Sequence, residues 1–166
     1  MVDSVISMNL ENSISAMINS VYNSGTTVNL QFRDEVGMTR DAQAYFRGAP
    51  ISGRPIFGKI SLNKTVLSNS SKEYIAATIF HEALHTFSKP VGTPNDHNDI
   101  ARYYVTPMAN ALREMFPALS SADAYSLAWG GLETTPYYTN PPSGVYIPSN
   151  QQETNGKYRS KELGHG

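Results

Sequence analysis

The sequence has 166 residues and a mass of 18.2 kDa, which is enough chain for one domain with a hydrophobic core. Its 13 basic and 14 acidic residues give a net charge of −1, so a basic nucleic-acid-binding surface and a polybasic membrane anchor are not expected. Because there is no cysteine, disulfides, thiolate zinc clusters and a cysteine nucleophile are excluded.

Charged residues make up only 16% of the chain, against roughly 25% in a typical soluble domain. A surface that relies on uncharged polar side chains is more typical of an exported protein. No apolar run approaches the roughly 20 residues of a membrane-spanning helix, so membrane insertion is not expected. No signal peptide is visible either. We therefore expect delivery by a route without a signal peptide, or a fragment of a larger secreted protein.

Apolar periodicity predicts one helix and three strands in the first 62 residues. Apolar side chains recur at helical spacing within the first 25 residues, and alternation predicts a half-buried strand over 28–32. A second short strand is predicted over 44–47 and a third over 56–62. The stretch between them, 48–55, is rich in Gly and Pro and predicts a turn.

From residue 70 the apolar period becomes helical. A capping box at 70–73 predicts the start of a largely buried helix over 74–87. A loop with two prolines then separates it from a second helix over 96–116, which Pro107 should kink or divide. A third helix is predicted to begin at Ser120 or the next serine and to end at a Gly-Gly pair.

Beyond Leu132 the composition changes to Pro, Gly, Asn, Gln and Tyr without periodicity. We therefore expect a domain over 1–135 and an irregular segment over 136–166 that packs on it or trails from it. The last fifteen residues are expected to be mobile, with His165 as a solvated tail residue. The order of one helix, three strands and three helices predicts the α+β class with a small sheet.

The segment His81-Glu82-Ala83-Leu84-His85 indicates a metal site. Two histidines four residues apart on a helix lie about 40° apart around its axis, so both can reach one zinc ion at ~2.0–2.1 Å. Glu82 then lies beside the metal without ligating it, in position to accept a proton from a water molecule. The apolar side of the same helix should hold the site against the sheet.

A catalytic zinc needs three protein ligands and one open position. His97, twelve residues after His85, is the preferred third ligand, because neutral imidazole suits zinc and His97 has no other evident role. Asp96 is the alternative, although it also stands where a helix N-cap belongs. A glutamate on a later helix would be Glu114 or Glu133.

Two known classes built on this motif do not fit. The metzincin pattern would place Gly at position 88 and His at 91, where this chain has Ser88 and Val91. Deformylases use the same helix motif with a cysteine ligand, which this chain lacks.

The HEALH helix, the segment that Asp96-His97 opens, and Trp129-Gly-Gly-Leu132 together resemble small bacterial zincin-like metallopeptidase domains. The resemblance covers roughly residues 60–135. It implies a minimal zincin fold, in which a small, mostly antiparallel sheet packs on the active-site helix together with two or three further helices. It also implies that His81, His85 and His97 are zinc ligands and that Glu82 is the catalytic base.

Such domains often stand at the C-termini of large secreted or polymorphic-toxin proteins. The resemblance therefore implies an effector or toxin domain, with a cognate inhibitor or immunity protein as a partner. The Gly92-Thr93 pair followed by Asp96 also resembles the Gly-Thr-x-Asp element of the aspartate-ligand class, with one extra residue, so Asp96 stays open as the third ligand.

Further residues are candidates for substrate handling. Tyr104 lies two helical turns after His97, and its phenol is a candidate oxyanion donor; Tyr74 is a second candidate. In zincin-like domains a sheet edge beside the active helix pairs with an extended peptide, and we expect the strand over 56–62 to be that edge. Trp129 is expected in the core.

These observations predict a zinc-dependent endopeptidase that acts on a protein or peptide substrate. A zinc-bound but catalytically silent peptide-binding module is the first alternative. A structural domain without metal, in which the histidines only pack, is the second.

Overall fold

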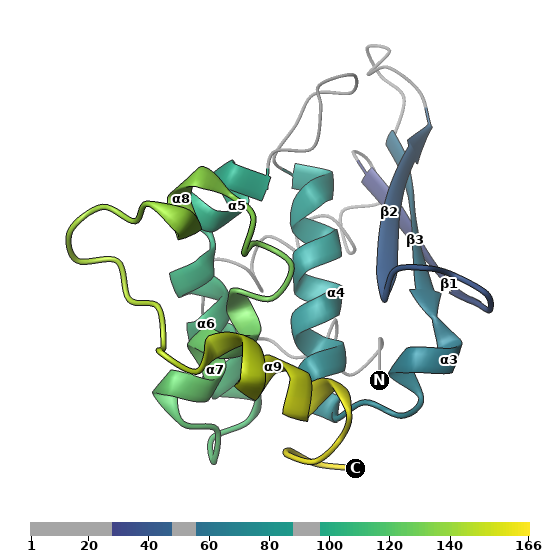
Figure 1. Ribbon diagram of the computed structural model, residues 1–166. Helices are drawn as coiled ribbons and strands as arrows, with labels where there is room; N and C mark the ends of the chain where they lie inside the picture. Colours follow the sequence, from purple (N-terminus) through teal and green to yellow (C-terminus); the bar gives the residue numbers. More distant parts are fainter. Residues whose placement is uncertain (1–27, 48–55, 88–96) are drawn as a thin grey trace.

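The computed structural model describes residues 28–47, 56–87 and 97–166 (Figure 1). Within these ranges it contains a three-stranded sheet and seven helices, which confirms the α+β class. The helix predicted in the first 25 residues lies outside the described residues. The elements are β1 Val28–Glu35, β2 Ala42–Arg47, β3 Ile56–Asn63, α3 Lys64–Leu67, α4 Lys72–Phe87, α5 His97–Tyr103, α6 Val105–Met115, α7 Ser121–Ala128, α8 Pro136–Thr139 and α9 Gln151–Arg159. No helix in the described ranges is long and apolar enough to cross a membrane.

All three predicted strands are present, but the sheet order β1-β3-β2 differs from the expectation in two ways. β3 lies at the centre, so the prediction that it is the edge was wrong. The sheet is mixed rather than mostly antiparallel, since β3 pairs in parallel with β1 and antiparallel with β2. The polar residues of β3 do not mark an exposed edge because Lys59 and Ser61 both donate hydrogen bonds to Glu35 of β1, at 2.5 and 2.9 Å.

Helix α4 stands between the sheet and the helices α5 to α9, whereas the short α3 lies at the end of β3 (Figure 1). It packs against β2 and β3 on one side and against α5, α6, α7 and α9 on the other. Apolar residues therefore face both sides, and Ala76, Ile79, Phe80, Ala83 and Leu84 are all buried. A helix enclosed in this way is rigid, which suits side chains that must hold a fixed geometry.

The start of α4 is shifted by one residue from the predicted capping box. Ser71, not Ser70, is the N-cap, and its hydroxyl accepts a hydrogen bond from the Tyr74 N–H at 3.2 Å. Ser70 donates instead to the carbonyl oxygens of Val66 and Arg159. The prediction missed this because Arg159 comes from the far end of the chain.

The predicted second helix is divided, as expected, but at Tyr104 rather than at Pro107. Tyr104 separates α5 from α6 with φ −120° and ψ −11°. Pro107 then lies in the first turn of α6, where a missing N–H breaks no hydrogen bond within the helix. The third predicted helix is confirmed as α7, with the Ser120 hydroxyl accepting from the Asp123 N–H.

The C-terminal segment is not irregular throughout 136–166, since it contains α8 and α9. Helix α9 packs along α7 and also contacts α4 (Figure 1). Its buried residues are polar or aromatic: Gln151 donates to the Ser126 carbonyl at 3.0 Å and Tyr158 to the Asp123 carboxylate at 3.1 Å. Hydrogen bonds replace apolar periodicity here, so a hydrophobicity pattern does not detect the helix.

The last residues are bound to the start of α4. The His165 side chain is exposed, as expected, but its backbone N–H and its ring contact the buried Glu73 carboxylate, so this residue is not a free tail residue. Gly164 has φ +87°, and a Cβ atom there would collide with Glu73 and Ser71. Only glycine fits this close approach.

Candidate metal centre

Three histidine side chains converge at the side of α4. His81 and His85 lie one turn apart on α4, and His97 is the first residue of α5. Their ring centroids are 4.8–5.3 Å apart, and one nitrogen from each ring lies within 4.8 Å of the others. The structure thus brings together the three histidines that the sequence selected.

The spacing of the first two histidines matches a shared metal ion. Their Nε2 atoms are 3.2 Å apart. Two nitrogens at 2.0–2.1 Å from one tetrahedral zinc ion are separated by about 3.3 Å. His81 and His85 could therefore share a metal ion as they stand, and His97, whose nitrogen lies within 4.8 Å of theirs, would move closer to complete the site.

The protonation state of His81 also suits a ligand. Burial, together with the neighbouring charges of His85 and His97, lowers the pKa of His81 to about 3. The ring is therefore neutral near pH 7 and keeps a lone pair, which metal binding requires. Its Nδ1 is shielded from solvent and has no hydrogen-bond partner within the described part of the chain. Gly131 lies next to the ring, since a Cβ there would be in ordinary van der Waals contact with its Cε1, at 3.5 Å.

The histidines open onto a cavity of about 360 Å³. Residues of α4 and of the start of β2 form two of its walls, and Gly131, which follows α7, also lines it. β2 is an edge strand of the described sheet, so only one of its two backbone edges pairs with β3. The lining residues are Arg40, Asp41, Ala42, Gln43, Ala44, Tyr74, Thr78, His81, Glu82, His85, His97 and Gly131.

Glu82 lines this cavity while being 9% exposed. Burial raises the pKa of its carboxyl to about 7, although a hydrogen bond from the Ala44 N–H and the positive charge of Arg40 act in the opposite direction. The backbone of Ala44, on β2, is therefore close to this carboxyl group. A carboxyl group with a pKa near neutrality can both accept and return a proton.

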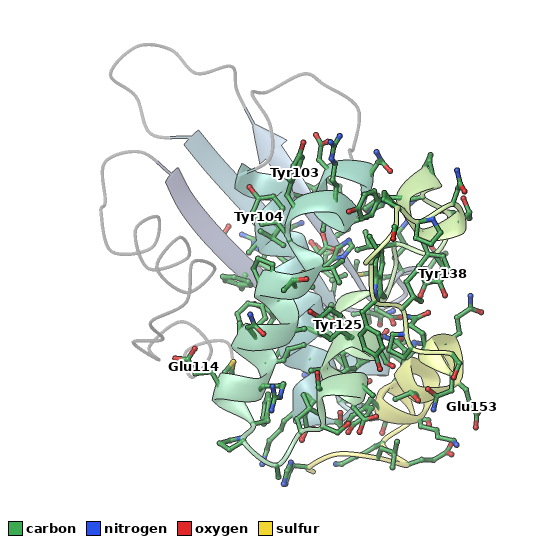
Figure 2. All side chains as sticks on the ribbon, turned by 90° about the vertical axis from the view of Figure 1, so that its left-hand side faces the viewer. Tyr103, Tyr104, Glu114, Tyr125, Tyr138 and Glu153 are labelled. Atoms are coloured by element: carbon green, nitrogen blue, oxygen red, sulfur yellow. The ribbon has the colours of Figure 1, made fainter. Side chains whose placement is uncertain are left out.

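Of the two candidate tyrosines, Tyr74 lines the cavity and Tyr104 does not. Tyr104 is half-buried against the core on the side of α5 and α6 that Figure 2 faces. The Tyr74 hydroxyl is already engaged, since it donates to the Asp41 carboxylate at 2.6 Å. Neither phenol is therefore a free oxyanion donor in this arrangement.

The alternative third ligands are not brought to the cluster. Glu114 is exposed near the end of α6 and points away from the helices in Figure 2. Glu133 accepts a hydrogen bond from Gln151 at 3.3 Å and does not line the cavity. Among the described residues the group that could hold a metal is the three histidines. Asp96 and the Gly92-Thr93 pair lie outside the described residues.

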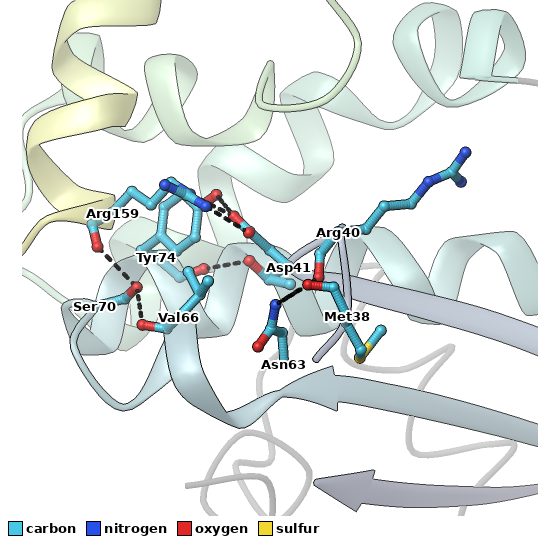
Figure 3. A network of polar contacts seen from close by, with 9 residues as sticks. Met38, Arg40, Asp41, Asn63, Val66, Ser70, Tyr74 and Arg159 are labelled. Atoms are coloured by element: carbon cyan, nitrogen blue, oxygen red, sulfur yellow. Dashed lines mark hydrogen bonds and ion pairs between the residues drawn. The ribbon is translucent and has the colours of Figure 1, made fainter. Parts of the chain in front are cut away.

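An ion-pair cluster that the sequence did not indicate forms one end of the cavity (Figure 3). Arg159 of α9 binds the Asp41 carboxylate through two nitrogens, at 2.7 and 2.8 Å, while Tyr74 donates to the same carboxylate. Burial raises the pKa of Asp41, but the bonds from Arg159 and Tyr74 outweigh it and lower the pKa overall. Asp41 and Arg159 are 118 residues apart, so no local pattern connects them.

Replacing Asp41 with Asn should therefore lower the free energy of unfolding at pH 7 by about 1–2 kcal/mol, since Arg159 is half-exposed. Because the folded pKa of Asp41 is below its unfolded value, the stabilisation is present above about pH 4 and is lost as the pH falls through the folded pKa. Urea unfolding followed by the fluorescence of the single tryptophan measures it. Asp34→Asn, at an exposed carboxylate, is the control. If the difference in unfolding free energy between wild type and Asp41→Asn stays constant at acid pH, this account is wrong.

Comparison with known proteins gives no match to a family model, to a curated protein or to a solved structure. The chemistry of the site is therefore inferred from the residues and distances of this chain.

Proposed function

We propose that the protein is a zinc-dependent endopeptidase. The observation that supports this most directly is the convergence of His81, His85 and His97 on one point, with the Nε2 atoms of the first two 3.2 Å apart, beside the buried Glu82. Three imidazoles are the ligand set that suits a catalytic zinc with one open position. All four side chains face a cavity large enough for part of a peptide.

In this proposal the three histidines hold the metal. A bound zinc ion would polarise the scissile carbonyl and stabilise negative charge on its oxygen. Glu82 accepts the proton of the attacking water and passes it to the leaving amine, a transfer that its pKa of about 7 suits.

The substrate strand is proposed to pair with β2 rather than with β3. β2 is the edge strand of the described sheet that packs on α4, and its residues 42–44 line the cavity. An extended peptide can add to such an edge through main-chain hydrogen bonds. A role as the effector domain of a larger secreted bacterial protein, with a cognate inhibitor, is part of the proposal and depends on the sequence resemblance alone.

A zinc-bound module that holds a peptide without cutting it is the second candidate. Glu82 favours the enzyme, because a buried carboxyl group beside a metal site costs desolvation energy that simple binding does not require. Peptide binding would also use the edge of β2, so geometry at that edge does not separate the two candidates.

The test combines metal analysis with proteolysis. We expect the purified protein to contain a single zinc ion per chain and to cleave unfolded casein, with activity lost to a chelator and restored by zinc. Zinc without cleavage of casein or of a peptide library would favour the silent module. A protein that binds no zinc, even when it is supplied, would exclude both candidates.

A further inference from the structure

We propose that Arg40 is a specificity residue that binds a carboxylate of the peptide substrate beside the metal centre. The inference rests on the proposed function, since it concerns the substrate of that same cavity. Arg40 precedes β2, is exposed, and lines the cavity together with the histidines and Glu82.

The backbone that carries Arg40 is fixed on both sides. The buried Asn63 side chain donates to the carbonyl oxygens of Met38 and Arg40, each at 3.0 Å, and the Asn63 N–H donates to the Asp41 carbonyl at 2.8 Å. The next side chain, Asp41, is held by Arg159. Figure 3 shows the Arg40 side chain extending away from this cluster. Because the backbone at Arg40 is already fixed, less conformational entropy is lost when its side chain binds a partner.

The guanidinium has no hydrogen-bond or ion-pair partner among the residues that the structure describes. The other arginine at this end of the cavity, Arg159, binds Asp41 through two of its nitrogens. Arg40 is close enough to Glu82 for its charge to act on that carboxyl group, which places it within reach of the reacting region.

The charge balance of the cavity favours an anionic group on the substrate. Asp41 is neutralised by Arg159, so Arg40 and Glu82 are the charged groups left on the walls apart from the histidines. A divalent ion on the histidines would make the cavity positive overall. Arginine binds carboxylates through two parallel hydrogen bonds, which gives both strength and orientation. The carboxylate can come from an acidic side chain near the scissile bond or from the C-terminus of the peptide.

The test compares zinc-loaded wild type, Arg40→Gln, Arg40→Lys and Arg113→Gln. Arg113 is exposed on α6 and does not line the cavity, so its variant matches Arg40→Gln in net charge. The probes are capped, alanine-rich peptides in which one Glu is moved along the chain, their Gln counterparts, and Gln peptides with a free C-terminal carboxylate. The readouts are kcat/KM for each peptide and, in a Glu82→Gln background that does not cut, the Kd by calorimetry.

We expect wild type and Arg113→Gln to prefer a carboxylate peptide over its neutral counterpart by about tenfold or more. Arg40→Gln should lose this preference, so that its carboxylate and neutral peptides react alike, and Arg40→Lys should keep part of it. The readout is this ratio within each variant, because removing the Arg40 charge beside Glu82 changes the rate for both kinds of peptide. The peptide set that shows the preference identifies the source of the carboxylate. No preference in wild type, or one that persists in Arg40→Gln, overturns the inference. If no peptide is cut, the proposed function fails, and the Kd values still decide whether Arg40 binds a carboxylate.

Discussion

Replacing Glu82 with Gln should reduce peptide hydrolysis by about two to four powers of ten and leave zinc binding unchanged. Gln has nearly the same shape and keeps an oxygen that can accept the hydrogen bond from the Ala44 N–H. It cannot accept the proton of the attacking water. The expected loss is therefore in kcat, because the substitution removes the proton transfer and not the binding of substrate or metal.

The measurements are kcat and KM on a peptide substrate, zinc content, and the melting temperature. Metal-free Glu82→Gln should be at least as stable as wild type, because the native carboxyl is buried and burial raises its pKa to about 7. Glu153→Gln, at an exposed glutamate of α9, is the matched control and should retain full activity. An active Glu82→Gln enzyme would show that another group accepts the proton.

The local part of the site could be predicted from the sequence because the geometry of a helix determines it. Two histidines four residues apart on one helix must lie on one face, so their Nε2 atoms converge once the helix forms. The strands were also found, since alternating apolar residues identify them without knowledge of their neighbours. Their order was not, because pairing depends on contacts between distant segments.

The C-terminal part shows where local patterns fail. Helix α9 buries Gln151 and Thr154, polar residues that a hydrophobicity pattern assigns to the surface. Its Arg159 holds the side chain of Asp41, which precedes β2 and lines the cavity. Nothing in either segment alone indicates this pairing, so the far end of the chain shapes the candidate site in a way that only the fold reveals.

Replacing His97 with Ala should lower zinc affinity by more than about a hundredfold. Loss of a residue that only supports a ligand typically costs ten- to a hundredfold, and loss of a ligand itself should cost more. The structure places the His97 ring 4.8 Å from that of His85 and 5.3 Å from that of His81. Competition with a fluorescent chelator measures the Kd, and circular dichroism confirms that the variant remains folded.

Asp96→Asn and His165→Ala are the matched controls. If His97 is the third ligand, the Asn variant should bind zinc within a few-fold of wild type, since Asp96 then serves at most as a helix cap. His165 contacts Glu73 at the start of α4, so its removal tests for zinc held by a histidine outside the cluster. The opposite pattern, with zinc lost in Asp96→Asn and kept in His97→Ala, would assign the site to the aspartate-ligand class. Because the two residues are adjacent, this pair of substitutions separates the ligand sets with little other change to the chain.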